Sequence, residues 1–443
     1  MLTFLCQAVK YNISSHNNLA IKVGDVMIRW RELSIVITIL LAVLVTGCTK
    51  KQNAANHMLD ADYIQMISHG PARVGSGEFM VVDGISYYVD YENASAVPVC
   101  NKPDCRHLSP RLDRGSTCNA AMEYEAIFPY SGHLYGIKLE SKGKMEIFAS
   151  DLDGGNKERL GEFPAGSVLQ DFLLVQSKLY YTTFGLSSEV PKESDSDMEL
   201  TWDLYTLDLD TLDTEKIISH TDIGHGIYLL GGTEEYQIYS MGDESSMAFY
   251  SLEYSTAQSE KIPINGTGYQ QVIPRKDGFY YVHISDNDAC SIHYFDMDKK
   301  EDRVYVSEEE IIDLLGDDVV TVNLQTSFGD GVIFGAYTMD QTQKGVFLKE
   351  NEDTPSVRLE LPDQMEKEEG IQFNGFSSET ENGMFFRYVK QTEIEKDVTD
   401  TVTWYAYEDK QALLNRTDDI KIVIEPKVSS MSNPVDSGGN ILN

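Results

Sequence analysis

Short segments in which apolar and polar residues alternate recur along most of the chain. One type of segment has a tyrosine or phenylalanine near its centre and is followed by turn-forming residues. Alternation of this kind, with aromatic and β-branched residues, is typical of β-strands separated by turns. Seven copies of this strand are predicted, at residues 85–91, 133–139, 178–184, 235–241, 278–284, 331–337 and 383–389.

Most copies are followed by a second strand that ends in acidic turn residues and by a short third strand. The second strands are predicted at residues 145–154, 202–211, 247–256, 290–299 and 402–411, with a looser copy at 344–353. The third strands are predicted at residues 157–163, 215–220, 260–265, 302–307, 356–361 and 412–417. One segment, Glu308–Leu315 (EEEIIDLL), has the pattern of a helix, which we place in a loop between strands.

These repeats predict an all-β fold, a single β-propeller built from three- to four-stranded antiparallel sheets. A unit of about 50 residues with three or four strands has the size of one propeller blade. Residues 77–426 accommodate seven such units, so seven blades are predicted, with six or eight as the alternatives. Ile420–Glu425 is a lone terminal strand that we expect to close the ring by pairing in the first blade, and residues 427–443 are expected to be a disordered tail.

An apolar run without repeat character precedes the predicted propeller. Residues 33–45 (LSIVITILLAVLV) make up this run of 13, which follows Arg29 and Arg31. A membrane-spanning helix needs about 20 apolar residues, so the run is too short to span a bilayer. A basic segment, a short apolar run and small residues before the cleavage point are typical of a secretory signal, which we predict over residues 27–47.

Val45-Thr46-Gly47-Cys48 ends this signal and resembles the bacterial lipobox. In a lipobox the cysteine thiol is diacylated and the cysteine becomes the new N-terminus. Two acyl chains hold a protein stably on a membrane, whereas one anchors it only marginally. We therefore predict lipidation of Cys48, a tether over residues 48–76 and a location on the outer face of the cell membrane, with an uncleaved membrane anchor as the alternative.

Residues 1–26 do not fit this arrangement. They are polar and place the signal far from the start of the chain, whereas Met27 begins a well-formed basic segment. We interpret residues 1–26 as an N-terminal extension that results from a misassigned start codon.

The chain is strongly acidic. Its 443 residues include 36 Lys and Arg against 71 Asp and Glu, which gives a net charge of −35. Removal of residues 1–47 takes away four basic and two acidic residues and leaves 32 and 69, a net charge near −37. Such a charge repels nucleic acid and anionic lipid head groups, so no nucleic-acid partner is expected and the membrane is contacted through the N-terminal lipid.

A distinctive cysteine segment accompanies the lipobox and the tyrosine-rich repeat, namely Val99–His107 (VCNKPDCRH) followed by Cys118-Asn119-Ala120. With these features the chain resembles a group of Gram-positive, Clostridia-type surface lipoproteins whose propeller-like domains have no known function. The resemblance extends over most of the mature chain. It implies a surface location and a propeller fold, and it implies no activity.

Cys100, Cys105, His107 and Cys118 have the spacing C-x4-C-x-H-x10-C. Three thiols and an imidazole so close in the chain are a candidate tetrahedral zinc set, and its role would be structural because four protein ligands leave no open position. A disulfide, Cys100–Cys105 or Cys105–Cys118, is the equal alternative, because disulfides are permitted outside the cytoplasm. Cys290 could then take the remaining thiol.

The sequence assigns no catalytic residue and requires no cofactor. We interpret the propeller as a non-catalytic binding or scaffold module that uses one face to bind a glycan, peptide or protein. Two polar, acidic insertions, residues 185–201 and 391–401, are expected to form loops near that face. The alternative is a carbohydrate-active hydrolase or lyase, which requires two carboxylates about 5 to 9.5 Å apart in the central funnel.

Overall fold

The computed structural model describes residues 20–23, 26–29, 64–67, 70–109, 112–113, 115–121, 124–139, 144–163, 168–186, 200–222, 226–243, 246–264, 272–285, 289–316, 321–338, 343–361, 370–395, 398–417 and 419–426. The apolar run of the signal, the lipidation site Cys48 and the predicted tail at 427–443 lie outside the described residues. None of the described helices is long and apolar enough to cross a membrane.

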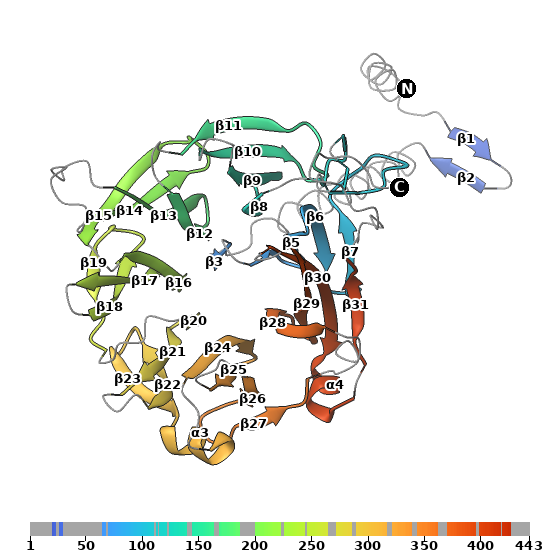
Figure 1. Cartoon of the computed structure of the whole chain (residues 1–443). Coiled ribbons are helices and arrows are strands. Elements are labelled where there is room, and N and C mark those ends of the chain that lie inside the picture. The colour runs from blue at the N-terminus through green and yellow to red at the C-terminus, as the bar shows by residue number, and fades with distance from the viewer. Residues whose placement is uncertain are drawn as a thin grey trace. The chain divides into compact units, whose positions relative to one another are not determined.

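The chain divides into two compact units, Met1–Met58 and Leu59–Asn443. In the first unit, β1 (Ala20–Val23) and β2 (Val26–Arg29) pair as an antiparallel hairpin. In the second unit, the described strands form seven antiparallel sheets that stand as blades around a ring (Figure 1). The predicted all-β propeller with seven blades is therefore confirmed.

Within each blade the strands follow the chain from the inside of the ring to the outside. Blade one consists of β4 (Ala72–Val74), β5 (Gly77–Val82), β6 (Ile85–Asp90) and β7 (Ser95–Pro98). Blade two consists of β8 (Ala126–Tyr130), β9 (His133–Leu139), β10 (Met145–Asp151) and β11 (Glu158–Glu162). Blade three consists of β12 (Val168–Val175), β13 (Lys178–Leu186), β14 (Leu200–Asp208) and β15 (Thr214–Asp222).

The other four blades repeat this order. Blade four consists of β16 (Ile227–Gly232), β17 (Tyr236–Asp243), β18 (Ser246–Glu253) and β19 (Ser259–Lys261), and blade five of β20 (Val272–Pro274), β21 (Gly278–Ile284), β22 (Cys290–Asp296) and β23 (Glu301–Val306). Blade six consists of β24 (Thr321–Phe328), β25 (Gly331–Tyr337), β26 (Gln343–Lys349) and β27 (Val357–Leu359), and blade seven of β28 (Ile371–Glu379), β29 (Gly383–Glu395), β30 (Val398–Asp409) and β31 (Lys421–Ile424).

The aromatic residue of the repeat fills the space between neighbouring blades. It is the fourth residue of the second strand in blades three to seven, and each copy is at most 1% exposed; the five copies are Tyr181, Tyr239, Tyr281, Phe334 and Phe386. Blade two has Gly136 in this position, and the ring of Tyr124 lies where a side chain would stand, 2.5 Å from an ideal Cβ. Buried aromatic side chains contribute the largest apolar areas to a core, so this single position accounts for much of the blade-to-blade packing.

The first copy of the predicted strand occupies a different position in its blade from the other six copies. Residues 85–91 correspond to β6, the third strand of blade one, whereas the other six copies correspond to second strands such as β9 and β13. The second strand of blade one is β5, whose fourth residue is Met80, where the second strands of blades three to seven have an aromatic residue. Because of this shift, the predicted start at residue 77 omits β4 and also β3 (Ile64–Met66), both of which belong to sheets of the propeller.

The chain end does not close the ring as predicted. We expected Ile420–Glu425 to pair in blade one, but β31 pairs with β30 and forms the outer strand of blade seven. Residues 412–417, the expected third strand, lie in and after the helix α4 (Lys410–Asn415) instead. The carboxylate of Asp409 accepts the backbone N–H groups of Gln411 and Ala412, and this N-cap starts the helix and leaves the outer position of the blade to β31.

The predicted helix is confirmed. α3 spans Glu308–Leu315, between blades five and six, and the hydroxyl of Ser307 accepts the backbone N–H of Glu310 as its N-cap. Three glutamates in the first turn stabilise the N-terminal end of the helix dipole. The carboxylate of Glu310 also forms an ion pair with the buried ammonium of Lys349, at 3.0 Å between oxygen and nitrogen. This ion pair fixes the helix against blade six.

Blade one and blade seven are joined through the carboxylate of Glu78, which is fully buried on β5. It accepts the hydroxyl of Tyr91 at 2.8 Å from its own blade. It also accepts the hydroxyl of Ser378 on β28 at 2.5 Å and the hydroxyl of Tyr405 on β30. Burial, followed by the charge of Glu78, raises the pKa of Tyr405 well above its usual value, so this phenol remains a donor. Three donors satisfy a buried charge that would otherwise be costly.

We predict that Glu78→Ala destabilises the propeller. The substitution leaves the buried hydroxyls of Ser378 and Tyr405 without their acceptor and removes bonds to a charged group, so we expect a loss of roughly 3 kcal/mol in the free energy of unfolding. Thermal or urea unfolding of both proteins measures the difference. Glu158→Ala, which removes an exposed carboxylate from β11, is the matched control and should change the stability by less than about 0.5 kcal/mol. Equal stabilities of the two variants would contradict the role of Glu78.

Candidate functional site

A hollow of about 720 Å³ lies at the centre of the ring. Its walls come from the ends of the innermost strands β4, β16, β20, β24 and β28 and from the hairpin turns that follow them. Met66 of β3 lines one side. The volume is within the range of small-molecule and peptide sites, and its position at the meeting point of five blades makes it the main candidate for a binding site.

The hollow and the acidic insertion 391–401 lie at opposite ends of the strands. The hollow is bordered by turns that connect first to second strands, whereas both insertions lie between second and third strands. Residues 391–401 are also not a loop, because Gln391 pairs with Thr401 and Glu395 pairs with Val398 as the hairpin of β29 and β30 continues. The expectation that these insertions form loops at the central binding face was therefore wrong for 391–401. Of the segment 185–201, the residues 187–199 lie outside the described residues.

The charge of the hollow is the reverse of the charge of the whole chain. Arg73, Arg275 and Lys276 line it, and Glu234 is the one carboxylate among its described lining residues. Glu234 lies 3.7 Å from the ammonium of Lys276, and both side chains are mostly exposed. In a chain with 71 acidic and 36 basic residues, a cationic cavity concentrates positive potential where negative charge is otherwise the rule.

Arg275 is held in place by two neighbours. Its guanidinium carbon lies 5.4 Å from the ring centre of Tyr280, and its Nη2 donates to the carbonyl oxygen of Gly331 at 2.5 Å. Its Nε and the Oε1 of Gln325, also on the wall of the hollow, are buried and have no hydrogen-bond partner among the described residues. A positioned guanidinium beside a second polar group is suited to bind a polar ligand group.

The carbohydrate hydrolase or lyase prediction required two facing carboxylates and aromatic side chains in the central funnel. The described lining of the hollow contains Glu234 alone as a carboxylate and has no Tyr, Phe or Trp. A pair of catalytic carboxylates is therefore not formed by the described residues at this place.

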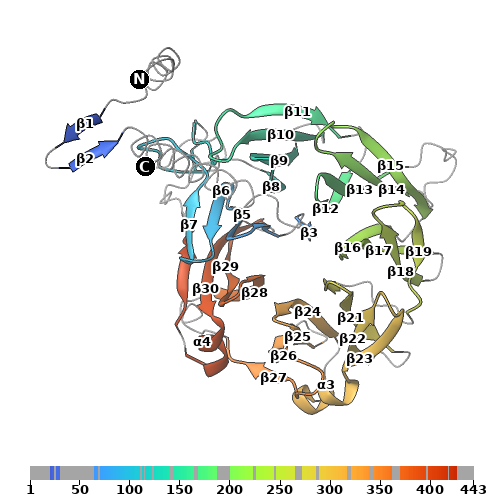
Figure 2. The same cartoon turned by 180° about the vertical axis from the view of Figure 1, so that it is seen from behind.

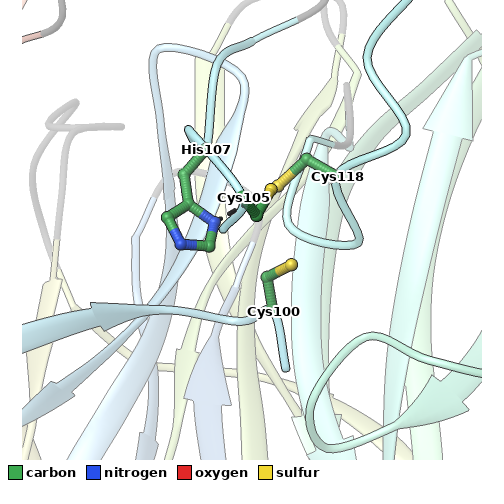
Figure 3. A group of neighbouring side chains, drawn as sticks. All are labelled: Cys100, Cys105, His107 and Cys118. Atoms are coloured by element: carbon green, nitrogen blue, oxygen red, sulfur yellow. Dashed lines mark hydrogen bonds between the residues drawn. The ribbon is translucent and has the colours of Figure 1, made fainter. Parts of the chain in front are cut away.

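Cys100, Cys105, His107 and Cys118 are brought together as the sequence predicted. One ligand atom from each of the four lies within 4.8 Å of the others, and the thiols and the imidazole point toward a common centre (Figure 3). The Sγ of Cys118 lies 3.5 Å from Nδ1 of His107. An ideal tetrahedral zinc site, with bonds of roughly 2.0 to 2.3 Å, needs ligand atoms that converge in this way. The cluster could thus hold a metal ion.

The cluster lies in the connection from blade one to blade two, after the outer strand β7 and before β8. Asp104 and His107 adopt positive φ angles of 61° and 50°, which turn the backbone sharply enough to bring the imidazole beside the thiols. The side chain of Asn101 donates to Asp153 at 2.6 Å, which fixes the loop on the hairpin turn of blade two.

The four described thiols of the propeller are free, and they differ in their surroundings. Burial raises the pKa of Cys118 to about 12. Burial also acts to raise the pKa of Cys100, but hydrogen bonds with the backbone of Lys102 and Asn119 and with the thiols of Cys118 and Cys105 together lower that pKa below its usual value. Cys290 lies on β22 in blade five, remote from this loop around the ring, and is not available to pair with the cluster (Figure 2).

A second polar cluster, in blade five, was missed at the sequence level. Nε2 of His293 on β22 lies 3.0 Å from the hydroxyl oxygen of Ser291. Nδ1 of the same ring lies 3.0 Å from a carboxylate oxygen of Asp302 on β23. This is the hydrogen-bond order of a Ser–His–Asp relay. Ser291 is only 9% exposed and pairs with His283 of the neighbouring strand, so its hydroxyl is not presented as an exposed nucleophile.

This cluster therefore stabilises the sheet. Burial lowers the pKa of His293, although the hydrogen bond and the charge of Asp302 oppose this shift. The i, i+2 spacing of Ser291 and His293 on one strand face could have suggested their proximity, but the contribution of Asp302 required the register of β22 with β23.

Comparison with known proteins supplies no family. No protein-family model matches the chain. No curated protein matches it either. Among solved structures, the β-propeller domain of the Trilobed protease from Pyrococcus furiosus is 11% identical, with a TM-score of 0.44, and the match covers 83% of this chain and 99% of that domain.

Two peptidases are similar in the same way. An acylaminoacyl peptidase is 10% identical with a TM-score of 0.46 and 82% of this chain covered, and a prolyl endopeptidase is 12% identical with a TM-score of 0.49 and 95% covered. The matched part spans 53% and 60% of these two peptidases. At this level of identity the likeness concerns the propeller fold alone.

Proposed function

We propose that this chain is an extracytoplasmic, membrane-anchored lipoprotein whose propeller is a non-catalytic binding module for a glycan, peptide or protein. The observation that carries the proposal is the central hollow, which gathers wall residues from five blades and holds three cationic side chains. Ends of strands from a rigid ring position such side chains well for binding. The Ser291, His293 and Asp302 cluster offers no exposed nucleophile, which favours binding over hydrolysis.

We expect that filling the hollow abolishes binding. Ser327 lines it on β24, and Ser327→Trp places an indole in the cavity. Defined sets of peptides and oligosaccharides are screened for binding to the full chain in detergent. Each bound ligand is then recovered, and its mass is measured by mass spectrometry to detect cleavage. Ligands of the wild type should bind the Trp variant at least tenfold more weakly and should be recovered intact.

Ser255→Trp, in the exposed turn after β18, is the matched control and should bind as the wild type does. Equal binding by the Ser327 variant would place the site elsewhere, and cleaved ligands would identify an enzyme instead of a binding module.

The proposed location rests on the lipobox at the end of the signal. Residues 33–45 supply the apolar run and Cys48 supplies the thiol for the lipid. The polar segment that follows allows the propeller to stand away from the membrane surface. A net charge near −37 on the mature chain supports this picture, because an acidic domain is repelled by anionic head groups and needs a covalent anchor.

We predict that Cys48→Ala releases the protein from the membrane fraction. Without the thiol no acyl chain is attached, and the uncleaved short apolar run holds the chain far less firmly than two acyl chains do. Fractionation with immunodetection measures the distribution, and Cys290→Ala, which removes a thiol of the propeller instead, serves as the matched control. Full retention of the Cys48 variant in the membrane fraction would rule out lipidation as the anchor.

We further propose that Cys100, Cys105, His107 and Cys118 hold a structural zinc ion. The support is their convergence within 4.8 Å and the preference of zinc for thiolate and imidazole ligands. Nδ1 of His107 faces Cys118 and would be the ligating nitrogen. The ion would fix the long connection between blades one and two, in which no strand ladder forms between β7 and β8 within the described residues.

We expect one zinc per chain in protein purified without chelator, measured by elemental analysis. Cys105→Ser should remove the zinc and lower the melting temperature, because a structural ion contributes its binding free energy to folding. Cys290→Ser, which alters a buried thiol outside the cluster, should keep the metal. Protein without metal that shows at most two reactive thiols after denaturation would instead establish a disulfide in this loop.

A further inference from the structure

We propose that the central hollow binds an extended, acidic peptide segment, which adds to the inner edges of the propeller and places its carboxylates against Arg275 and Lys276. The proposal rests on the proposed binding function and specifies the ligand. It begins from a feature of the chain itself, the position of β3.

β3 is an extended segment inside the ring that is not part of any blade's own run of strands (Figure 1). It pairs antiparallel with β12, the innermost strand of blade three, with Met66 opposite Leu173 and Ile64 opposite Val175. The N–H of Ile67 continues the ladder by donating to the carbonyl of Phe172 at 2.9 Å. The centre of this ring therefore already accommodates one added peptide strand, by the same main-chain pairing that sheets use to recognise extended peptides.

The corresponding edges on the other side of the hollow carry no such strand within the described residues. β20 and β24 are terminal in the strand order of their sheets, and both contribute residues to the wall. Glycines at 70, 75, 231 and 232 also line the hollow, and they add no side chains of their own to its wall. An extended peptide can approach such walls closely and pair with exposed N–H and C=O groups.

Charge specifies the class of peptide. Arg275 offers a planar guanidinium that is fixed against Tyr280 and Gly331, which suits it to a carboxylate. Lys276 follows it in the turn, and Arg73 stands on the wall formed by β4. The described lining has no aromatic side chain on which the apolar face of a sugar ring could pack, so a peptide is favoured over an acidic glycan.

The test uses the full chain in detergent and a fluorescein-labelled hexapeptide, Val-Glu-Val-Glu-Val-Glu, followed by fluorescence anisotropy. The Val-Gln hexapeptide keeps the extended backbone and removes the charge, and hexagalacturonate keeps the carboxylates and removes the peptide. We expect the Val-Glu peptide to bind at least tenfold more tightly than the Val-Gln peptide, with an affinity that falls as salt rises. Hexagalacturonate should not displace it.

The double variant Arg275→Gln, Lys276→Gln should weaken binding of the Val-Glu peptide at least tenfold and leave the Val-Gln peptide unchanged. Lys299→Gln, Lys300→Gln makes the same charge change in the outer turn of the same blade and should bind as the wild type does. Because Arg275 also joins two blades, Lys276→Gln alone, at a side chain that is 80% exposed, provides a variant that folds normally and should lose affinity threefold or more.

Four results would overturn the inference. Equal binding of the Val-Glu and Val-Gln peptides, or equal loss in both lysine-containing double variants, would remove the role of these cations. Binding of hexagalacturonate in place of the peptides would overturn the peptide assignment while the proposed binding function stands. If neither probe binds, the inference fails, and the ligand screen with Ser327→Trp then decides separately whether the hollow binds anything.

Discussion

The seven blades form a ring whose first and last members are held together by side chains, because no described strand from one end of the chain joins the sheet at the other end. β4 to β7 complete blade one from one continuous segment, and β28 to β31 complete blade seven in the same way. At this junction the fully buried carboxylate of Glu78 accepts hydrogen bonds from the hydroxyls of Ser378 and Tyr405. A buried charge with three donors is strongly directional, so it fixes the two blades in one relative position rather than only attracting them.

The central hollow depends on this junction. Ser377 on the wall of the hollow is the neighbour of Ser378, and Arg73 and Gly75 on the opposite side of the junction belong to the segment that leads into β5. Any slippage between blades one and seven would therefore move the wall that carries Arg73 relative to the wall that carries Arg275. The closure of the fold and the shape of the candidate site are thus two consequences of the same contact.

Charge divides the molecule into two environments. The chain as a whole is acidic, while the hollow collects cations in a confined space. Field lines are focused in such a depression, so an acidic ligand would be attracted to the hollow and repelled elsewhere. The cluster of three cysteines and one histidine lies outside this site, in the connection between blades one and two. A metal ion held there would stabilise this connection.

The sequence by itself determined the features that depend on local pattern. Alternation and the repeated aromatic position predicted the strands, the number of blades and the helix Glu308–Leu315, because period and propensity act over a few residues. The spacing of Cys100, Cys105, His107 and Cys118 likewise predicted a cluster within one loop. Only the tertiary structure decided which strand ends meet in the middle, so Arg73, Arg275 and Lys276 could not be singled out among 36 basic residues. It also decided the closure at Glu78, because residues 300 and 327 positions away supply its donors and no local pattern records such a distance.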